Sequence, residues 1–192
     1  MAAVPQPAAI EQPVFYYDLG DPECYLLAER IMTALPVVGG RVPEFEPVLA
    51  ADLGATVAEL DRGRLERQAG ELGIQPLRWP RRWPPETLEA MLAATYAKRI
   101  GRTVAFSLAA FRQAFAGGRD LGDRDTVLIA GAACEMHPAA LLKGIALRST
   151  VEALAAANMR ARHAGVRKLP AIQVQDAVFE NLRDAARALE RA

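Results

Sequence analysis

The residues best suited to chemistry are Asp21 and Cys24, which follow a short run of apolar and aromatic residues. The four residues Val14–Tyr17 suit a short strand buried on both faces, and Gly20 then turns the chain toward a helix. Asp21 can cap that helix through its side-chain oxygen, and Pro22 has no amide to leave unpaired. A carboxylate at this place can also exchange protons with a substrate. The pattern predicts a strand-to-helix junction, at which Asp21 and Cys24 are the candidate catalytic residues.

Each of these residues also has a purely structural interpretation. Asp21 can serve only as a helix cap, although capping and proton transfer do not exclude each other. Cys24 is followed by apolar residues and suits a small core residue as well as a nucleophile. The second cysteine, Cys134, is far away in sequence, so neither a disulfide framework nor a cysteine-based metal site is indicated. His137 and His163 have no Cys, Asp or Glu at ligand spacing, and we expect no metal site.

Composition and charge limit the fold size and the kinds of molecule that the protein can bind. The chain has 192 residues, of which 52% are hydrophobic, so one domain with a sizeable core is possible. Its 23 basic and 23 acidic side chains cancel, which argues against nucleic acid and anionic membranes as partners. Residues 1–12 lack the basic and apolar regions of a secretory signal, and no later stretch is apolar enough to span a bilayer. We expect a disordered leader on a cytoplasmic protein.

The order of elements predicts a mixed sheet. A helix through Ile31 follows the first strand, and residues 42–49 read as a second strand. Pro43 and Pro47 each remove a backbone donor, which favours an edge position for that strand. This is a βαβ unit with parallel strands. Residues 171–174 and 177–179 read as a hairpin, and Asn181 can cap a closing helix.

Between these strands the pattern changes to helical periods, from about residue 55 to residue 165. Candidate helix starts follow Pro85, Asp123 or Asp125, Pro138, and Ser149 or Thr150. Within this region, ahead of its long helices, residues 78–83 form a loop in which arginine and tryptophan side chains lie close together in the sequence. Such a loop can bind an anionic aromatic ligand through charge and cation–π contacts, or it can simply pack its rings and solvate its guanidinium groups.

Four segments together are similar to one protein family. The sequence resembles the DsbA-like thioredoxin superfamily, in the branch of kappa-class glutathione transferases and 2-hydroxychromene-2-carboxylate isomerases. The resemblance implies an α/β thioredoxin-like fold, βαβ then ββα, interrupted by an all-helical insertion. The thioredoxin-like domain would then comprise residues 13–54 and 166–192, and the insertion residues 55–165. The segments are Phe15-Tyr16-Tyr17-Asp18 with Pro22 and Tyr25-Leu26, Gly73–Leu77, Ala110–Asp123, and Gly165–Ala171.

The resemblance also implies roles for particular residues. In the family, a Cys or Ser that handles the thiol stands at the position of Asp21, where helix amides stabilise a thiolate. Pro170 matches the cis-proline, and the backbone of Leu169 would pair with glutathione. Glu180 and Asn181 stand where the family grips the γ-glutamyl end of glutathione. The residues expected around the substrate pocket are Tyr17, Arg78, Trp79 and Trp83.

Three functions remain open from the sequence. The first is an enzyme like the glutathione-dependent isomerases and transferases, acting on a small hydrophobic or aromatic substrate. The second is a thioredoxin-fold binding protein that has lost its chemistry. The third is a DsbA-type thiol-disulfide oxidoreductase, which the missing Cys-x-x-Cys motif opposes because Asp21 stands in place of the first cysteine. The resemblance further implies a homodimer.

Overall fold

The structure is a computed structural model that describes residues 12–35, 42–54 and 60–191. The expected disordered leader, apart from Gln12, lies outside these residues. Within them a four-stranded mixed sheet has the order β2-β1-β3-β4. The strands are β1 (Val14–Tyr17), β2 (Glu44–Pro47), β3 (Ala171–Val174) and β4 (Ala177–Phe179).

The pairing of the strands matches the predicted topology. β1 pairs with β2 in parallel, with Val14 opposite Glu44 and Tyr17 opposite Pro47. β3 pairs with β1 and β4 in antiparallel fashion. The second strand is shorter than the predicted 42–49, and it lies at the edge of the sheet, as the two prolines indicated.

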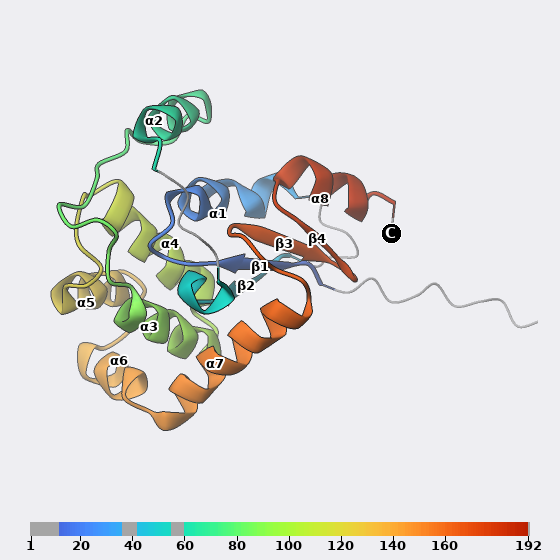
Figure 1. Ribbon diagram of the computed structural model, residues 1–192. Helices are drawn as coiled ribbons and strands as arrows, with labels where there is room; N and C mark the ends of the chain where they lie inside the picture. Colours follow the sequence, from blue (N-terminus) through green and yellow to red (C-terminus); the bar gives the residue numbers. More distant parts are fainter. Residues whose placement is uncertain (1–11, 36–41, 55–59, 192) are drawn as a thin grey trace, which may run out of the picture.

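The helices complete a thioredoxin-like fold with a helical insertion between β2 and β3. In Figure 1, α1 and α8 lie on one side of the sheet and α7 on the other, while α3 to α6 form a helical block beside it. Their bounds are α1 (Pro22–Ala34), η1 (Ala50–Leu53), α2 (Arg62–Glu71), α3 (Leu88–Arg99), α4 (Thr103–Phe115), α5 (Arg124–Ala132), α6 (Pro138–Ile145), α7 (Arg148–His163) and α8 (Leu182–Leu189).

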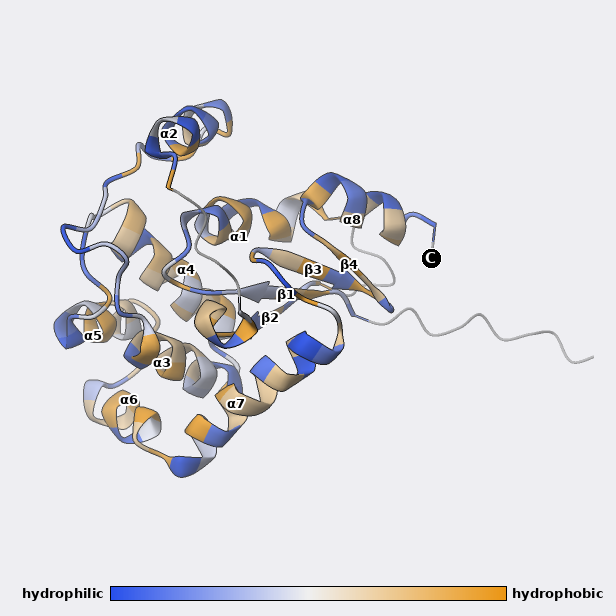
Figure 2. Cartoon of the chain, viewed as in Figure 1, coloured by the Kyte–Doolittle hydropathy of each residue, from blue (hydrophilic) through white to orange (hydrophobic). Residues whose placement is uncertain are grey.

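Two helices differ from the sequence-based expectation. α7 begins at Arg148, and Thr150 does not open it; the Thr150 hydroxyl instead donates to the carbonyl of Gly144 at 2.8 Å. α2 was not predicted as a separate helix. It is mostly hydrophilic in Figure 2, and Leu65 and Ala69 are its buried residues. A helix with so narrow an apolar stripe gives a weak periodic signal.

Ion pairs connect the insertion to the edge of the sheet. The Nζ of Lys98 on α3 lies 2.6 Å from Glu44 Oε1 and 2.5 Å from Glu46 Oε2 on β2. Arg160 on α7 approaches the same Glu46 oxygen at 3.2 Å. Because Glu46 is buried, these cations supply the partners that its charge needs. The sheet and the insertion therefore share one packed structure.

No helix of the described residues is long and apolar enough to cross a membrane. The expected homodimer stays a prediction.

Candidate active site

The amino end of α1 is closed by the side chain of Asp21, as predicted. Asp21 has extended backbone angles, and its Oδ1 accepts hydrogen bonds from the amides of Glu23 at 2.7 Å and Cys24 at 3.2 Å. Pro22 occupies the first helical turn, where a missing amide leaves no bond unmade. One carboxylate oxygen thus fills the place at which these amides could hold an external anion.

The segment before β3 brings a second predicted element to Asp21. The Leu169–Pro170 peptide bond is cis, which confirms the expectation drawn from the family resemblance. Leu169 and Asp21 line the same cavity. Among the hydrogen bonds of the described residues, none involves the backbone amide or carbonyl of Leu169. Its peptide groups are therefore available to a ligand that reaches this cavity.

The cavity has a volume of about 300 Å³, at the small end of the range for ligand sites. It lies where the β1–α1 turn, η1, α2 and the segments before α3 and β3 meet. Its apolar wall consists of Pro22, Ala50, Ala51, Leu60, Leu65, Trp83, Pro84, Pro85 and Leu169. Its charged residues are Asp18, Asp21, Glu23, Asp61, Arg64 and Lys168.

Burial in this cavity changes the acidity of Asp21. Loss of solvent raises the pKa of the carboxyl from 3.8 to about 7, while the hydrogen bonds from the Cys24 and Glu23 amides act in the opposite direction. The neighbouring carboxylates of Glu23 and Asp18 add to the rise. Near neutral pH the carboxyl can therefore both donate and accept a proton, which is the condition for general acid–base chemistry.

A second carboxyl in the cavity, Asp18, was not predicted as a site residue. It is 6% exposed, and its oxygens accept from the amide of Gly20 at 2.9 Å and the amide of Ala50 at 3.0 Å. Burial raises its pKa, against these bonds and one from the Thr87 side chain. Its position directly after a buried strand is a signal in the sequence. Because its partners belong to η1 and to the residue before α3, Asp18 fixes the turn that carries Asp21.

Cys24 lies behind this turn and not in the cavity lining. Its side chain is 0% exposed, and burial followed by the nearby Asp21 raises the pKa of the thiol well above its usual value. Because the thiolate is the nucleophile, such a cysteine is inert. The structural interpretation of Cys24 therefore fits its surroundings.

The aromatic and cationic loop contributes one of its three predicted residues to the cavity. Trp83 lines it, and its peptide bond to Pro84 is cis. Trp79 instead packs at right angles on Trp83, with 6.0 Å between ring centroids, and its Nε1 donates to Glu66 on α2 at 2.7 Å. Arg78 is not among the lining residues. Trp79 therefore supports α2, which forms one wall of the cavity.

Tyr17 lies in the hydrophobic core and not in the cavity lining, contrary to our expectation. Its side chain is 0% exposed, its hydroxyl lies 2.6 Å from that of Ser107, and its ring packs on those of Phe45 and Phe111. Burial raises the pKa of its phenol far above the usual value. Its aromatic type is explained by packing between the sheet and α4.

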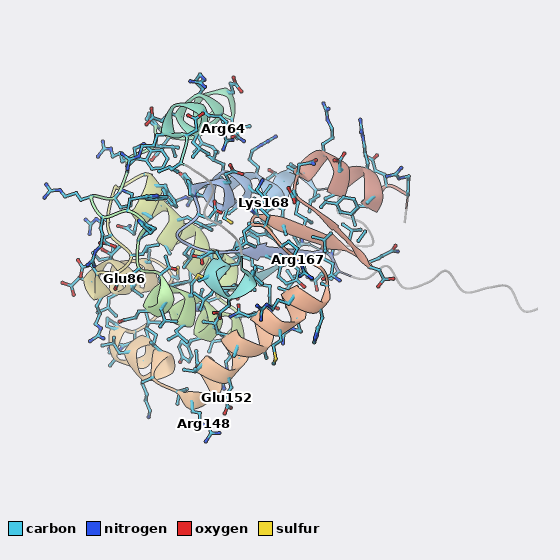
Figure 3. The ribbon with its side chains drawn as sticks, in the orientation of Figure 1. Arg64, Glu86, Arg148, Glu152, Arg167 and Lys168 are labelled. Carbon is cyan, nitrogen blue, oxygen red and sulfur yellow. The ribbon has the colours of Figure 1, made fainter. Side chains whose placement is uncertain are left out.

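The pair after the hairpin is also placed outside the cavity lining. Asn181 caps α8 by accepting a hydrogen bond from the Asp184 amide at 2.9 Å, as its sequence position predicted. Glu180 lies 3.6 Å from the Nζ of Lys168, which does line the cavity. The other cation of the cavity, Arg64 on α2, pairs with Glu23 on α1. Figure 3 shows Arg64 and Lys168, which sequence reasoning missed because nothing local marks them.

The described residues contain no group of three or more His, Cys, Asp or Glu side chains that could hold a metal ion.

Comparison with solved structures identifies the fold. The structure is similar to that of 2-hydroxychromene-2-carboxylate isomerase, with a TM-score of 0.78 at 17% identity over 94% of this chain and 93% of that one. It is also similar to a probable DsbA oxidoreductase from Streptomyces coelicolor, with a TM-score of 0.76 at 16% identity over 94% and 88% of the two chains. A third similar structure is the cytosolic disulfide reductase DsbM from Pseudomonas aeruginosa with GSH, with a TM-score of 0.68 at 16% identity over 94% and 98%.

These TM-scores show a DsbA-like thioredoxin fold with a helical insertion, of the kind found in the isomerase. No protein-family model matches the sequence, and no curated protein matches it significantly. The chemistry therefore has to be argued from the site.

The first prediction concerns dithiol chemistry. The wild-type protein should not reduce insulin with dithiothreitol above the buffer rate, because Cys24 is buried and position 21 carries no thiol. Asp21→Cys should gain measurable activity, because it places a thiol at the helix amides that Asp21 now occupies. Asp123→Cys, which changes the cap of a distant helix, serves as the control. Wild-type activity equal to that of Asp21→Cys would overturn this argument.

The second prediction concerns stability. Because the pKa of Asp21 is about 7 in the folded protein and near 3.8 when unfolded, the folded state binds more protons between these values, and stability falls as the pH rises from about 4 to 7. Asp21→Asn keeps a capping oxygen, but its side chain does not titrate between pH 4 and pH 8. The free energy of unfolding of Asp21→Asn relative to wild type should therefore rise over this interval, by up to about 4 kcal/mol. Urea unfolding at pH 4, 6 and 8 measures it, and a constant difference would contradict the assignment.

Proposed function

We propose that the protein is an enzyme that acts on a small hydrophobic or aromatic substrate in this cavity, with an isomerase- or transferase-like reaction and glutathione as the candidate cosubstrate. The observation that carries the proposal is the arrangement of Asp21. Its Oδ1 is held by two helix amides, its Oδ2 accepts no hydrogen bond within the described residues, and it lines an apolar cavity beside Leu169. A fixed carboxyl with one free oxygen is suited to proton transfer.

Asp21 would exchange a proton with the substrate at Oδ2. With a pKa of about 7, both protonation states are populated near neutrality, so the same group can remove a proton and return it. Isomerisation that moves a proton needs both steps. Asp18 would act as a positioning residue, because its two oxygens are already engaged by backbone amides.

The backbone of Leu169 supports glutathione as the candidate cosubstrate. A tripeptide can hydrogen-bond to the amide and carbonyl of Leu169, which make no bond within the described residues. DsbM, which shares this fold, has been solved with GSH. A glutathione thiolate near Asp21 would accept a hydrogen bond from the protonated carboxyl and would be repelled by the ionised one. Glu180 and Asn181 give less support, because they do not line the cavity.

A second candidate is a binding protein without chemistry. The amides of Glu23 and Cys24, which would otherwise stabilise a thiolate, are bonded to Asp21 itself. This arrangement favours a site that binds a small molecule and leaves its thiol unactivated.

The third prediction tests glutathione. If only the protonated form of Asp21 hydrogen-bonds to the glutathione thiolate, a pKa of about 7 makes this form about tenfold scarcer at pH 8 than at pH 6. Wild-type affinity for glutathione, measured by isothermal titration, should therefore fall about tenfold between these values relative to that of Asp21→Ser. Asp21→Ser has no charge and keeps a hydroxyl donor, so its affinity should be the same at both values apart from titration of glutathione itself.

S-Methylglutathione, which carries no thiol proton, provides the control ligand. Negligible heat for wild type and Asp21→Ser at both pH values would contradict a role for glutathione and favour the binding-protein alternative.

A further inference from the structure

Of the four carboxyls that line the cavity, the two at the β1–α1 turn, Asp18 and Asp21, have no cationic partner in the described residues. Neither Asp18 nor Asp21 has a Lys, Arg or His nitrogen within 4.0 Å of its carboxylate oxygens among residues 12–35, 42–54 and 60–191. A buried carboxylate is stable only with a partner or a proton, so a ligand that carries a positive charge would stabilise the ionised form of these carboxyls.

Of these two carboxyls, only Asp21 has a free acceptor oxygen. Both oxygens of Asp18 accept backbone amides, and Oδ1 of Asp21 accepts two more. Oδ2 of Asp21 accepts none within the described residues. No buried side-chain oxygen of the described residues lacks a partner, so this atom is accessible from the cavity that Asp21 lines.

The two cations at the cavity are already paired with acids. Arg64 contacts Glu23, and Lys168 lies 3.6 Å from Glu180. The lining as a whole has more acids than bases, because Asp18, Asp21, Glu23 and Asp61 face Arg64 and Lys168. An anionic ligand would have to displace an existing pair and would also approach Asp21. A cationic ligand meets neither obstacle.

The walls around Asp21 suit an apolar or aromatic ligand. Leu65, Leu169 and Pro84 border the cavity together with the indole of Trp83. An indole attracts a cation through its ring face, and an apolar wall strengthens a charge pair by excluding water. A volume of about 300 Å³ accommodates a molecule of the size of a phenylalkylamine.

We propose that the cavity binds a small apolar or aromatic amine, whose ammonium group donates a hydrogen bond to Oδ2 of Asp21. This names the substrate class of the proposed function and rests on it for the location of the site. It does not depend on glutathione. The ammonium supplies the positive charge that stabilises the ionised carboxyl, and the rest of the ligand is buried against the apolar wall.

The experiment compares three probes of similar size and different charge. 2-Phenylethylamine, 2-phenylethanol and 3-phenylpropanoate are titrated into wild-type protein at pH 7.5, with binding followed by calorimetry and by tryptophan fluorescence. The amine should bind at least about tenfold more tightly than the alcohol, because a hydrogen bond to a charged partner is stronger than a neutral one. The propanoate should bind more weakly than both.

Matched variants locate the preference for the amine. Asp21→Asn keeps the helix cap and removes the charge, so the amine and the alcohol should bind with equal affinity. Asp123→Asn also exchanges a capping carboxylate for an amide, but it lies outside the cavity lining and should retain the wild-type preference.

Equal affinities of wild type for the amine and the alcohol would overturn the proposal, as would an amine preference that persists in Asp21→Asn. The wild-type comparison needs no variant and stays decisive if Asp21→Asn does not fold. Amine binding without glutathione binding would contradict only the cosubstrate of the proposed function, whereas glutathione binding without amine binding would contradict only this inference.

Discussion

The hydrogen bonds from the first amides of α1 to the Asp21 carboxyl determine what this site can do. In a thioredoxin-like fold the amino end of α1 offers free amides and a positive helix end, which stabilise an anion. Here the protein supplies that anion itself, since Oδ1 accepts from Glu23 and Cys24. The same burial that isolates the carboxyl raises its pKa to about 7. The amides that could stabilise a thiolate are therefore occupied by a group that can exchange a proton.

The insertion gives this carboxyl its surroundings. Leu65 on α2 and the segment before α3 provide four of the nine residues of the apolar wall, and Asp18 connects the β1–α1 turn to η1 and to Thr87. Lys98 holds the helical block to β2 through Glu44 and Glu46. The acidity of Asp21 therefore depends on contacts made by residues far away in the sequence.

The parts of the site that local chemistry determines could be predicted from the sequence. The cap at Asp21 and the cap at Asn181 follow from residue type at a helix start, and the cis bond at Pro170 follows from the family resemblance. The position of Asp18 after a strand is a signal in the sequence, but its contacts with Ala50 and Thr87 depend on which segments meet in space, as does the place of Lys168. Tyr17 shows that an aromatic residue beside a site can pack entirely in the core.

The most direct test is the pKa of the Asp21 carboxyl itself. Protein labelled with ¹³C is titrated from pH 3 to pH 9, and the Asp21 Cγ resonance is assigned by its absence from Asp21→Asn. A midpoint of about 7, well above that of an exposed aspartate, is the predicted result. A midpoint at or below 4 would show an ordinary ionised helix cap, and would contradict both the proton-transfer role and the loss of solvent on which it rests.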